Sequence, residues 1–124
     1  MLLVIDTYIL PMLLYGSDMW DMTVKSSRRL DAFDQWCLRR VLRIPFSAHV
    51  TNLEVRRRSA QPPVTQTIKV RRLRLFGHVA RSDPMQDHTR ALCACISNPP
   101  RDWRRPRGRP RQTWLRTIEK DPQE

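Results

Sequence analysis

Apolar residues recur at helical spacing between residues 23 and 44, which makes this stretch the clearest predicted helix. Its apolar positions follow one another at steps of three and four: Leu30, Phe33, Cys37, Val41 and Ile44, widened by Leu38 and Leu42. Thr23 is expected to cap the start of the helix, and Pro45 is expected to stop it near Ile44. Most arginines of the stretch lie off this stripe, so the pattern predicts a basic outer face.

Two further helices are predicted on either side of a proline break. The stretch Thr51-Asn-Leu-Glu54 matches a capping box and predicts a short helix from Leu53 to about Ser59. Pro62-Pro63 predicts extended backbone after it. A second basic helix is then expected from about Thr65 to Arg81, with these apolar residues on one face: Ile68, Leu75, Phe76 and Val79.

The composition changes between residues 98 and 111, which contain four prolines, six arginines and one acid. Such a segment cannot build a core and is expected to be extended. Shorter helices are predicted at 85–97 and 112–121, and no stretch shows sustained period-two alternation. The predicted fold class is therefore all-α, a small irregular helical domain of about four to six helices. Its expected parts are an apolar end (1–22), a basic helical region (23–97), a basic linker (98–111) and a C-terminal amphipathic helix (112–124).

The apolar run at residues 1–15 does not fit a targeting or membrane segment. A signal peptide begins with positive charge, whereas residues 1–22 contain Asp6, Asp18 and Asp21 and no Lys or Arg. A spanning helix needs about 20 apolar residues, and Asp6 and Pro11 interrupt this run. We interpret it as a segment that is buried against protein, with a missing partner and a cut edge.

Charge points to a polyanionic partner. The 124 residues carry 23 Lys plus Arg against 12 Asp plus Glu, a formal net charge of +11, and 20 of the 23 cations are arginine. Because the guanidinium group binds phosphate in a bidentate manner and stacks on bases, nucleic acid is favoured over a membrane surface. Three cysteines are too few for a disulfide framework and favour a reducing compartment, so a nuclear or cytoplasmic location is expected, nuclear first.

The sharpest motif is Arg104-Arg-Pro-Arg-Gly108-Arg-Pro-Arg111, whose centre resembles the AT-hook. Prolines hold such a segment extended, glycine allows close approach to the minor-groove floor, and Arg107 and Arg109 would lie along the groove. Arg104, Arg105 and Arg111 would then contact phosphates. A general phosphate contact by a flexible basic linker is the alternative, and both alternatives predict nucleic-acid binding.

The helix at 65–81 supplies the other predicted contacts. From Arg56 to Arg81 there are eight cations and no acid, whereas solvated helix faces usually mix both signs. Arg71, Arg72 and Arg74 are therefore predicted to bind nucleic acid. Trp103 could stack on an exposed base or pack against a neighbouring helix.

No catalytic constellation is found in the sequence, and no cofactor, metal or small-molecule substrate is expected. His78, His88, Cys93 and Cys95 have none of the usual zinc-ligand spacings. Asp31 and Asp34, three residues apart on a helix, are expected to pair with arginines instead of forming an acid–base dyad.

Four stretches resemble the C-terminal region of non-LTR (LINE-type) retrotransposon reverse transcriptases, in the family's order. They are Leu13-Leu-Tyr-Gly-Ser-Asp-Met-Trp20, Arg29-Leu-Asp-Ala-Phe-x-x-x-Cys37-Leu-Arg-Arg-Val-Leu42, Arg72-Leu-Arg-Leu-Phe-Gly-His-Val-Ala-Arg81 and Arg105-Pro-Arg-Gly-Arg-Pro-Arg-x-x-Trp114. Asp18 stands where the family usually has glutamate. Together the matches span about residues 9–121.

The resemblance implies a fragment without the family's endonuclease and polymerase centres, and therefore no enzymatic activity. It implies contact with template RNA or target DNA through the basic helices, and it relates the apolar N-terminal run to the end of the polymerase thumb. Two alternatives remain open: a protein-interaction module that docks on a polymerase chain, and a translated remnant without function.

Overall fold

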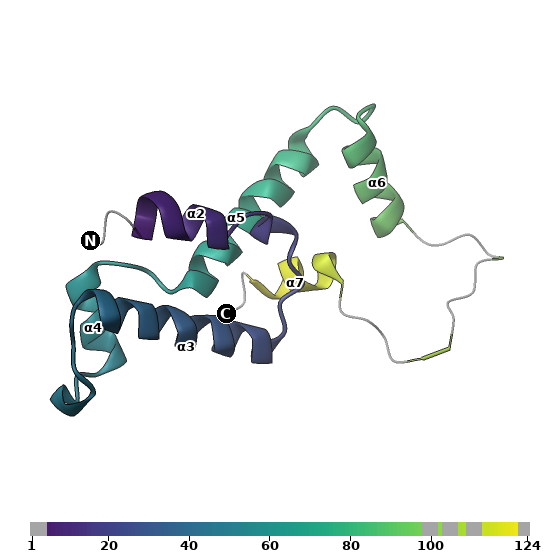
Figure 1. Ribbon diagram of the computed structural model, residues 1–124. Coiled ribbons are helices and arrows are strands. Elements are labelled where there is room, and N and C mark those ends of the chain that lie inside the picture. Colours follow the sequence, from purple (N-terminus) through teal and green to yellow (C-terminus); the bar gives the residue numbers. More distant parts are fainter. Residues whose placement is uncertain (1–4, 98–101, 103–106, 109–112, 122–124) are drawn as a thin grey trace.

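The computed structural model describes residues 5–97, 102, 107–108 and 113–121, and its regular elements over these residues are all helices. A π-helical turn η1 (Ile5–Ile9) and a 3₁₀ turn η2 (Ser17–Met19) flank the first α-helix, and a further 3₁₀ turn η3 (Phe46–Ala48) follows the second (Figure 1). The described residues form these α-helices: α2 (Leu10–Leu13), α3 (Val24–Val41), α4 (Asn52–Ser59), α5 (Val64–Arg81), α6 (Asp87–Ile96) and α7 (Trp114–Lys120). The predicted all-α fold class is confirmed.

The first long helix, α3, begins as predicted and ends three residues early. The hydroxyl of Thr23 accepts a hydrogen bond from the backbone N–H of Ser26 at 3.2 Å. Leu42 caps the other end, and Arg43 turns into the left-handed region with φ of 54°. The chain therefore leaves the helix before Pro45.

The predicted apolar stripe of α3 is wrong at Phe33, whose side chain is 49 % exposed. The buried positions of α3 are Asp34 and Leu38. Asp34 forms an ion pair with Arg56 of α4, which neutralises the carboxylate and allows this polar position to face inward. The face of α3 that is buried is therefore centred on Asp34 and Leu38, and it differs from the face that the apolar spacing predicts.

Helix α4 has half of the predicted capping box. Thr51 accepts a hydrogen bond from the N–H of Glu54 at 3.3 Å. The carboxylate of Glu54 instead accepts from Arg57 Nε at 2.8 Å, Arg57 Nη2 at 3.0 Å and Arg58 Nε at 2.8 Å. These hydrogen bonds, first from Arg57 and then from Arg58, lower the pKa of Glu54 to about 2.

We expect the carboxyl of Glu54 to titrate near pH 2 in the folded chain, which carboxyl carbon NMR measures directly. Because the folded pKa lies below the ordinary 4.5, the stabilisation from this carboxylate is complete above about pH 4.5. It is lost as the pH falls through 2. The double variant Arg57→Ala/Arg58→Ala should move the midpoint back toward 4.5. A wild-type midpoint near 4.5 would show that the two arginines do not hold the carboxylate in solution.

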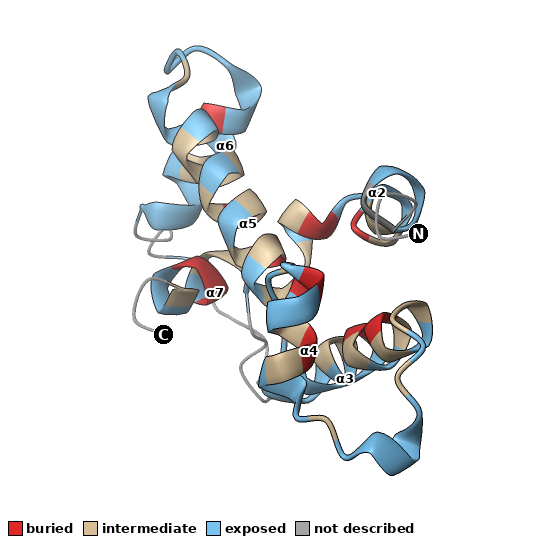
Figure 2. Ribbon diagram, turned by 90° about the vertical axis from the view of Figure 1, so that its left-hand side faces the viewer, coloured by how far each residue is buried: buried red, intermediate tan, exposed pale blue. Residues whose placement is uncertain are grey.

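Buried apolar residues of the described chain form two small clusters. Leu38 and Val55 form one between α3 and α4, and Leu14 forms the other with Val64 and Ile68 of α5. Figure 2 shows the buried residues as small patches where the helices meet. Leu14 is 1 % exposed, so the N-terminal stretch contributes to the core of the same domain as the basic helices.

The C-terminal helix α7 packs against the segment that follows α2. Trp114 Nε1 donates to the carbonyl oxygen of Asp18 at 2.7 Å, and the Thr117 hydroxyl donates to Asp21 Oδ1 at 3.1 Å. The Trp114 ring also lies against Phe76 of α5, with ring centroids 6.3 Å apart. Residues near both ends of the chain therefore meet on α5.

No helix in the described ranges has the length and apolar character that crossing a membrane requires.

Candidate nucleic-acid interface

The three arginines predicted on α5 occupy three different environments. Arg74 is exposed to solvent. Arg71 is half-buried, and its Nη1 donates to the carbonyl oxygen of Leu14 at 3.1 Å. Arg72 is 1 % exposed, and its Nη1 lies 2.6 Å from Asp121 Oδ2 in a buried ion pair. Of the three, Arg74 alone presents its side chain freely at the surface.

Arg72 is therefore a structural residue, and its predicted contact with nucleic acid does not fit its position. It follows Ile68 by one helical turn, so it shares the face of α5 that packs inward. The carboxylate of Asp121, at the end of α7, makes burial of the guanidinium possible by neutralising it.

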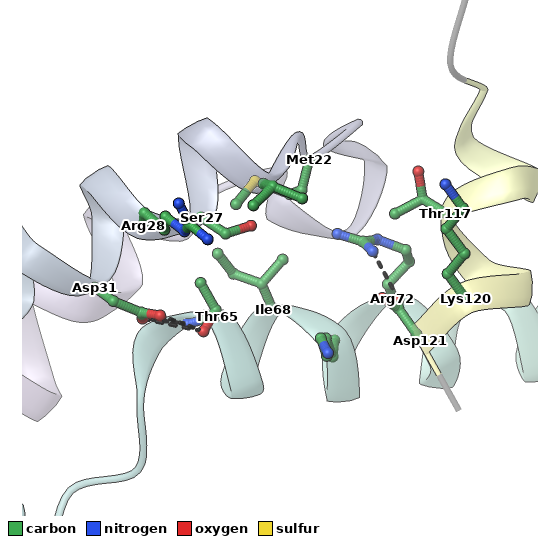
Figure 3. A pocket seen from close by; sticks show the side chains of 12 residues that line it. Met22, Ser27, Arg28, Asp31, Thr65, Ile68, Arg72, Thr117, Lys120 and Asp121 are labelled. Atoms are coloured by element: carbon green, nitrogen blue, oxygen red, sulfur yellow. Dashed lines mark hydrogen bonds and ion pairs between the residues drawn. The ribbon is translucent and has the colours of Figure 1, made fainter. Parts of the chain in front are cut away.

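A small pocket of about 260 Å³ lies where α3, α5 and α7 meet, and Arg72 lines one end of it (Figure 3). At the opposite end the Thr65 hydroxyl donates to Asp31, at 3.0 and 2.9 Å from the two carboxylate oxygens. Ile68 lies between these two polar pairs. The pocket thus joins three helices through paired polar groups, and Asp31 pairs with threonine instead of the predicted arginine.

The Pro/Arg segment is described at two of its predicted contact residues. Arg107 and Gly108 are both exposed, and Gly108 has φ of +145°, a backbone conformation that L side chains rarely adopt. Glycine at this position is therefore required by the backbone. Arg104, Arg105, Arg109 and Arg111, together with Trp103, lie outside the described residues.

Cations and acids are distributed differently over the described surface. The exposed cations that have no acidic partner among the described residues lie on and just after α3, on α5, on α7 and at position 107: Lys25, Arg28, Arg29, Arg40, Arg43, Arg74, Arg81, Arg107, Arg116 and Lys120. Most of the described acids accept a hydrogen bond or form an ion pair within the chain, although Asp21, Asp83 and Asp87 are themselves exposed: Asp21, Asp31, Asp34, Glu54, Asp83, Asp87 and Asp121. The outward charge that remains is positive.

An exposed aromatic pair on α3 is the feature that sequence reasoning missed. The rings of Phe33 and Trp36 stack with centroids 6.2 Å apart and an interplanar angle of 22°. The guanidinium carbon of Arg40 lies 5.3 Å from the centre of the Trp36 ring. Aromatic residues three apart on a helix, followed by arginine four residues later, are the sequence pattern that indicates this arrangement.

The histidines and cysteines form no group of metal ligands within the described part of the chain, where no three His, Cys, Asp or Glu side chains converge. His78 and His88 stack with ring centroids 6.2 Å apart. Cys93 and Cys95 are exposed, whereas Cys37 is half-buried. Burial, and then the charge of Asp34, raise the pKa of the Cys37 thiol.

Comparison of the chain with protein-family models, with curated proteins and with solved structures finds no match. A functional assignment therefore depends on the residues and contacts of this chain, and on the sequence resemblance given above.

Proposed function

We propose that this chain is a non-catalytic nucleic-acid-binding segment, similar to the C-terminal region of a non-LTR retrotransposon reverse transcriptase. In this role it contacts template RNA or target DNA through arginines on its helices and through the AT-hook-like segment around Gly108. The resemblance of four ordered stretches to that family supports the proposal, as does the formal net charge of +11.

The observation that carries the proposal is the group of exposed arginines that form no ion pair with the described acids. Asp34 and Asp121 are paired with buried or half-buried arginines, while Arg29, Arg40 and Arg74 project to solvent. Exposed cations that form no ion pair bind a polyanion without first breaking internal ion pairs.

The binding mechanism is electrostatic. Each arginine that approaches a phosphate displaces a condensed counterion, so the observed affinity rises as the salt concentration falls. Contacts to phosphate position the protein, whereas contacts in a groove or to bases distinguish one sequence from another. Arg74 and Arg81 serve the first purpose on α5, because both are exposed and lie about two helical turns apart on the same side.

Fluorescence anisotropy with labelled A·T-rich duplex, G·C-rich duplex and hairpin RNA over a salt series tests the proposal. Binding to at least one ligand should weaken steeply with salt, with a log–log slope of about −0.9 for each duplex phosphate contacted. Preference for the A·T-rich duplex would indicate groove recognition, and equal affinity for the three ligands would indicate a general phosphate contact.

Failure to bind any of the three ligands at low salt would contradict the proposal. The protein-docking alternative would then be favoured by the large apolar side chains exposed near the start of the chain. These are Tyr8, Ile9, Met12 and Tyr15, which are 65 %, 49 %, 80 % and 86 % exposed.

A further inference from the structure

The outward face of α3 carries an aromatic surface that the fold leaves open. Phe33 is 49 % exposed and Trp36 is 56 % exposed, although large aromatic side chains usually supply much of a core. Leu38 and Asp34 already attach the opposite face of the helix to α4, and Asp31 attaches it to Thr65 of α5. The two rings stack on each other on α3, a helix that lies at an edge of the fold (Figure 1).

Cations extend this aromatic pair along the helix. Arg29, Phe33, Trp36 and Arg40 follow at steps of four, three and four, which places them on one line over about 16 Å. Both arginines are exposed, and Arg40 lies over the Trp36 ring. The acids of the helix, Asp31 and Asp34, face inward, so the line itself carries positive charge.

A shallow hollow opens beside each ring. The hollow next to Phe33 has a volume of about 650 Å³ and reaches Trp20, Arg29 and Asp21, whose carboxylate accepts a hydrogen bond from Thr117. The hollow next to Trp36 has a volume of about 760 Å³ and reaches Arg40 and the fully open ring of Phe46. Both hollows are open to solvent, so a ligand that enters them from outside can reach the rings.

We propose that the line Arg29–Phe33–Trp36–Arg40 is a stacking site for the unpaired bases of a single-stranded nucleic acid. This inference rests on the proposed function and assigns it a binding surface and a class of ligand. Every base has a π-face that stacks on an aromatic ring, and the guanidinium groups at either end of the line bind the phosphates that join the bases. At 3.4 Å per stacked nucleotide, the line matches about five nucleotides.

The charge of the surface favours this occupant over an apolar protein segment. A protein partner would have to cover Arg29 and Arg40 and supply carboxylates for them, whereas a single strand supplies a phosphate beside every base. A duplex has the same phosphates, but its bases are stacked on one another and offer no free face to the rings. The site is therefore expected to discriminate single strands from duplexes.

The test measures the affinity of the full chain for a labelled 12-nucleotide poly-dT strand and for a 12-base-pair duplex at one salt concentration. Phe33→Ala/Trp36→Ala should bind the single strand about 10- to 100-fold more weakly and change duplex binding by less than about twofold. Trp36→Phe keeps a ring and should retain most of the single-strand affinity. Tyr15→Ala, which removes an exposed ring that does not belong to α3, should bind like the wild type.

A second variant separates stacking from apolar contact and from loss of folding. Phe33→Leu/Trp36→Leu keeps apolar bulk but removes both π-faces, and it should lose single-strand affinity like the alanine variant while its circular dichroism stays that of the wild type. Quenching of tryptophan fluorescence by the strand should also be smaller in Trp36→Phe than in the wild type.

The outcomes separate the two proposals. A wild-type chain that binds neither strand nor duplex overturns the proposed function, and this inference with it. A wild type that binds both, with the leucine variant unchanged or equally weakened for both ligands, overturns the stacking site alone. Unchanged single-strand binding in the leucine variant would show that stacking on bases does not occur here, and it would favour a protein partner for this face of α3.

Discussion

Replacing Arg72 with alanine is expected to lower the free energy of unfolding by about 3–5 kcal/mol, the usual cost of breaking a buried ion pair. The side chains of Arg72 and Asp121 are 1 % and 5 % exposed. The substitution would leave the Asp121 carboxylate buried without its cation and would remove the contact that attaches the end of α7 to α5. Urea denaturation followed by circular dichroism measures the change.

The matched control is Arg74→Ala, two residues away on the same helix but exposed. It should change the free energy of unfolding by no more than about 0.5 kcal/mol. The double variant Arg72→Met/Asp121→Leu should recover most of the lost stability, because apolar residues of similar size tolerate burial. Equal effects of the Arg72 and Arg74 substitutions would show that the ion pair does not form in solution.

Replacing the five arginines at positions 104, 105, 107, 109 and 111 with alanine is expected to flatten the salt dependence of nucleic-acid binding. If each contacts one duplex phosphate, the log–log slope becomes smaller by about 4 to 5. Between 50 and 200 mM salt, the wild-type affinity would then fall roughly 10²- to 10³-fold further than that of the variant. The anisotropy salt series measures both slopes.

The control variant is Arg107→Lys/Arg109→Lys, which keeps the charge on both sides of Gly108 and removes the planar guanidinium groups. A general phosphate contact predicts an almost unchanged slope and an unchanged ranking of duplexes. Recognition of the minor groove predicts loss of any preference for A·T-rich DNA. A slope that the alanine variant shares with the wild type would remove the segment from the binding mechanism.

The helix starts were predictable because capping is a local property. The hydroxyls of Thr23 and Thr51 each accept a hydrogen bond from a backbone N–H only three residues further along the chain. Pro63 has the extended backbone that precedes α5. The sequence did not indicate that the carboxylate of Glu54 would bind Arg57 and Arg58 instead of closing the capping box. Both partners lie within one helical turn, and the charged hydrogen bonds are the stronger.

The candidate interface was harder to predict because burial of a charged residue depends on a distant partner. Helical spacing does place Arg72 on the apolar face of Ile68, Leu75 and Val79, but the carboxylate that allows its burial is 49 residues further along. Phe33 is the opposite case, an apolar residue that was predicted to be buried but is exposed. Its spacing fits an apolar stripe, but the ion pair between Asp34 and Arg56 turns a different face of α3 inward.

The sequence by itself determined the all-helical class, the starts of α3 and α4, the proline break and the excess of positive charge. These depend on local backbone preferences and on counting. The tertiary structure alone decided which arginines remain free, which aromatic rings stay open, and that α7 packs against Asp18 and Asp21. Helical periodicity shows which residues share a face, but contacts between distant segments select the face that is buried, because a buried charge is stable only where another segment neutralises it.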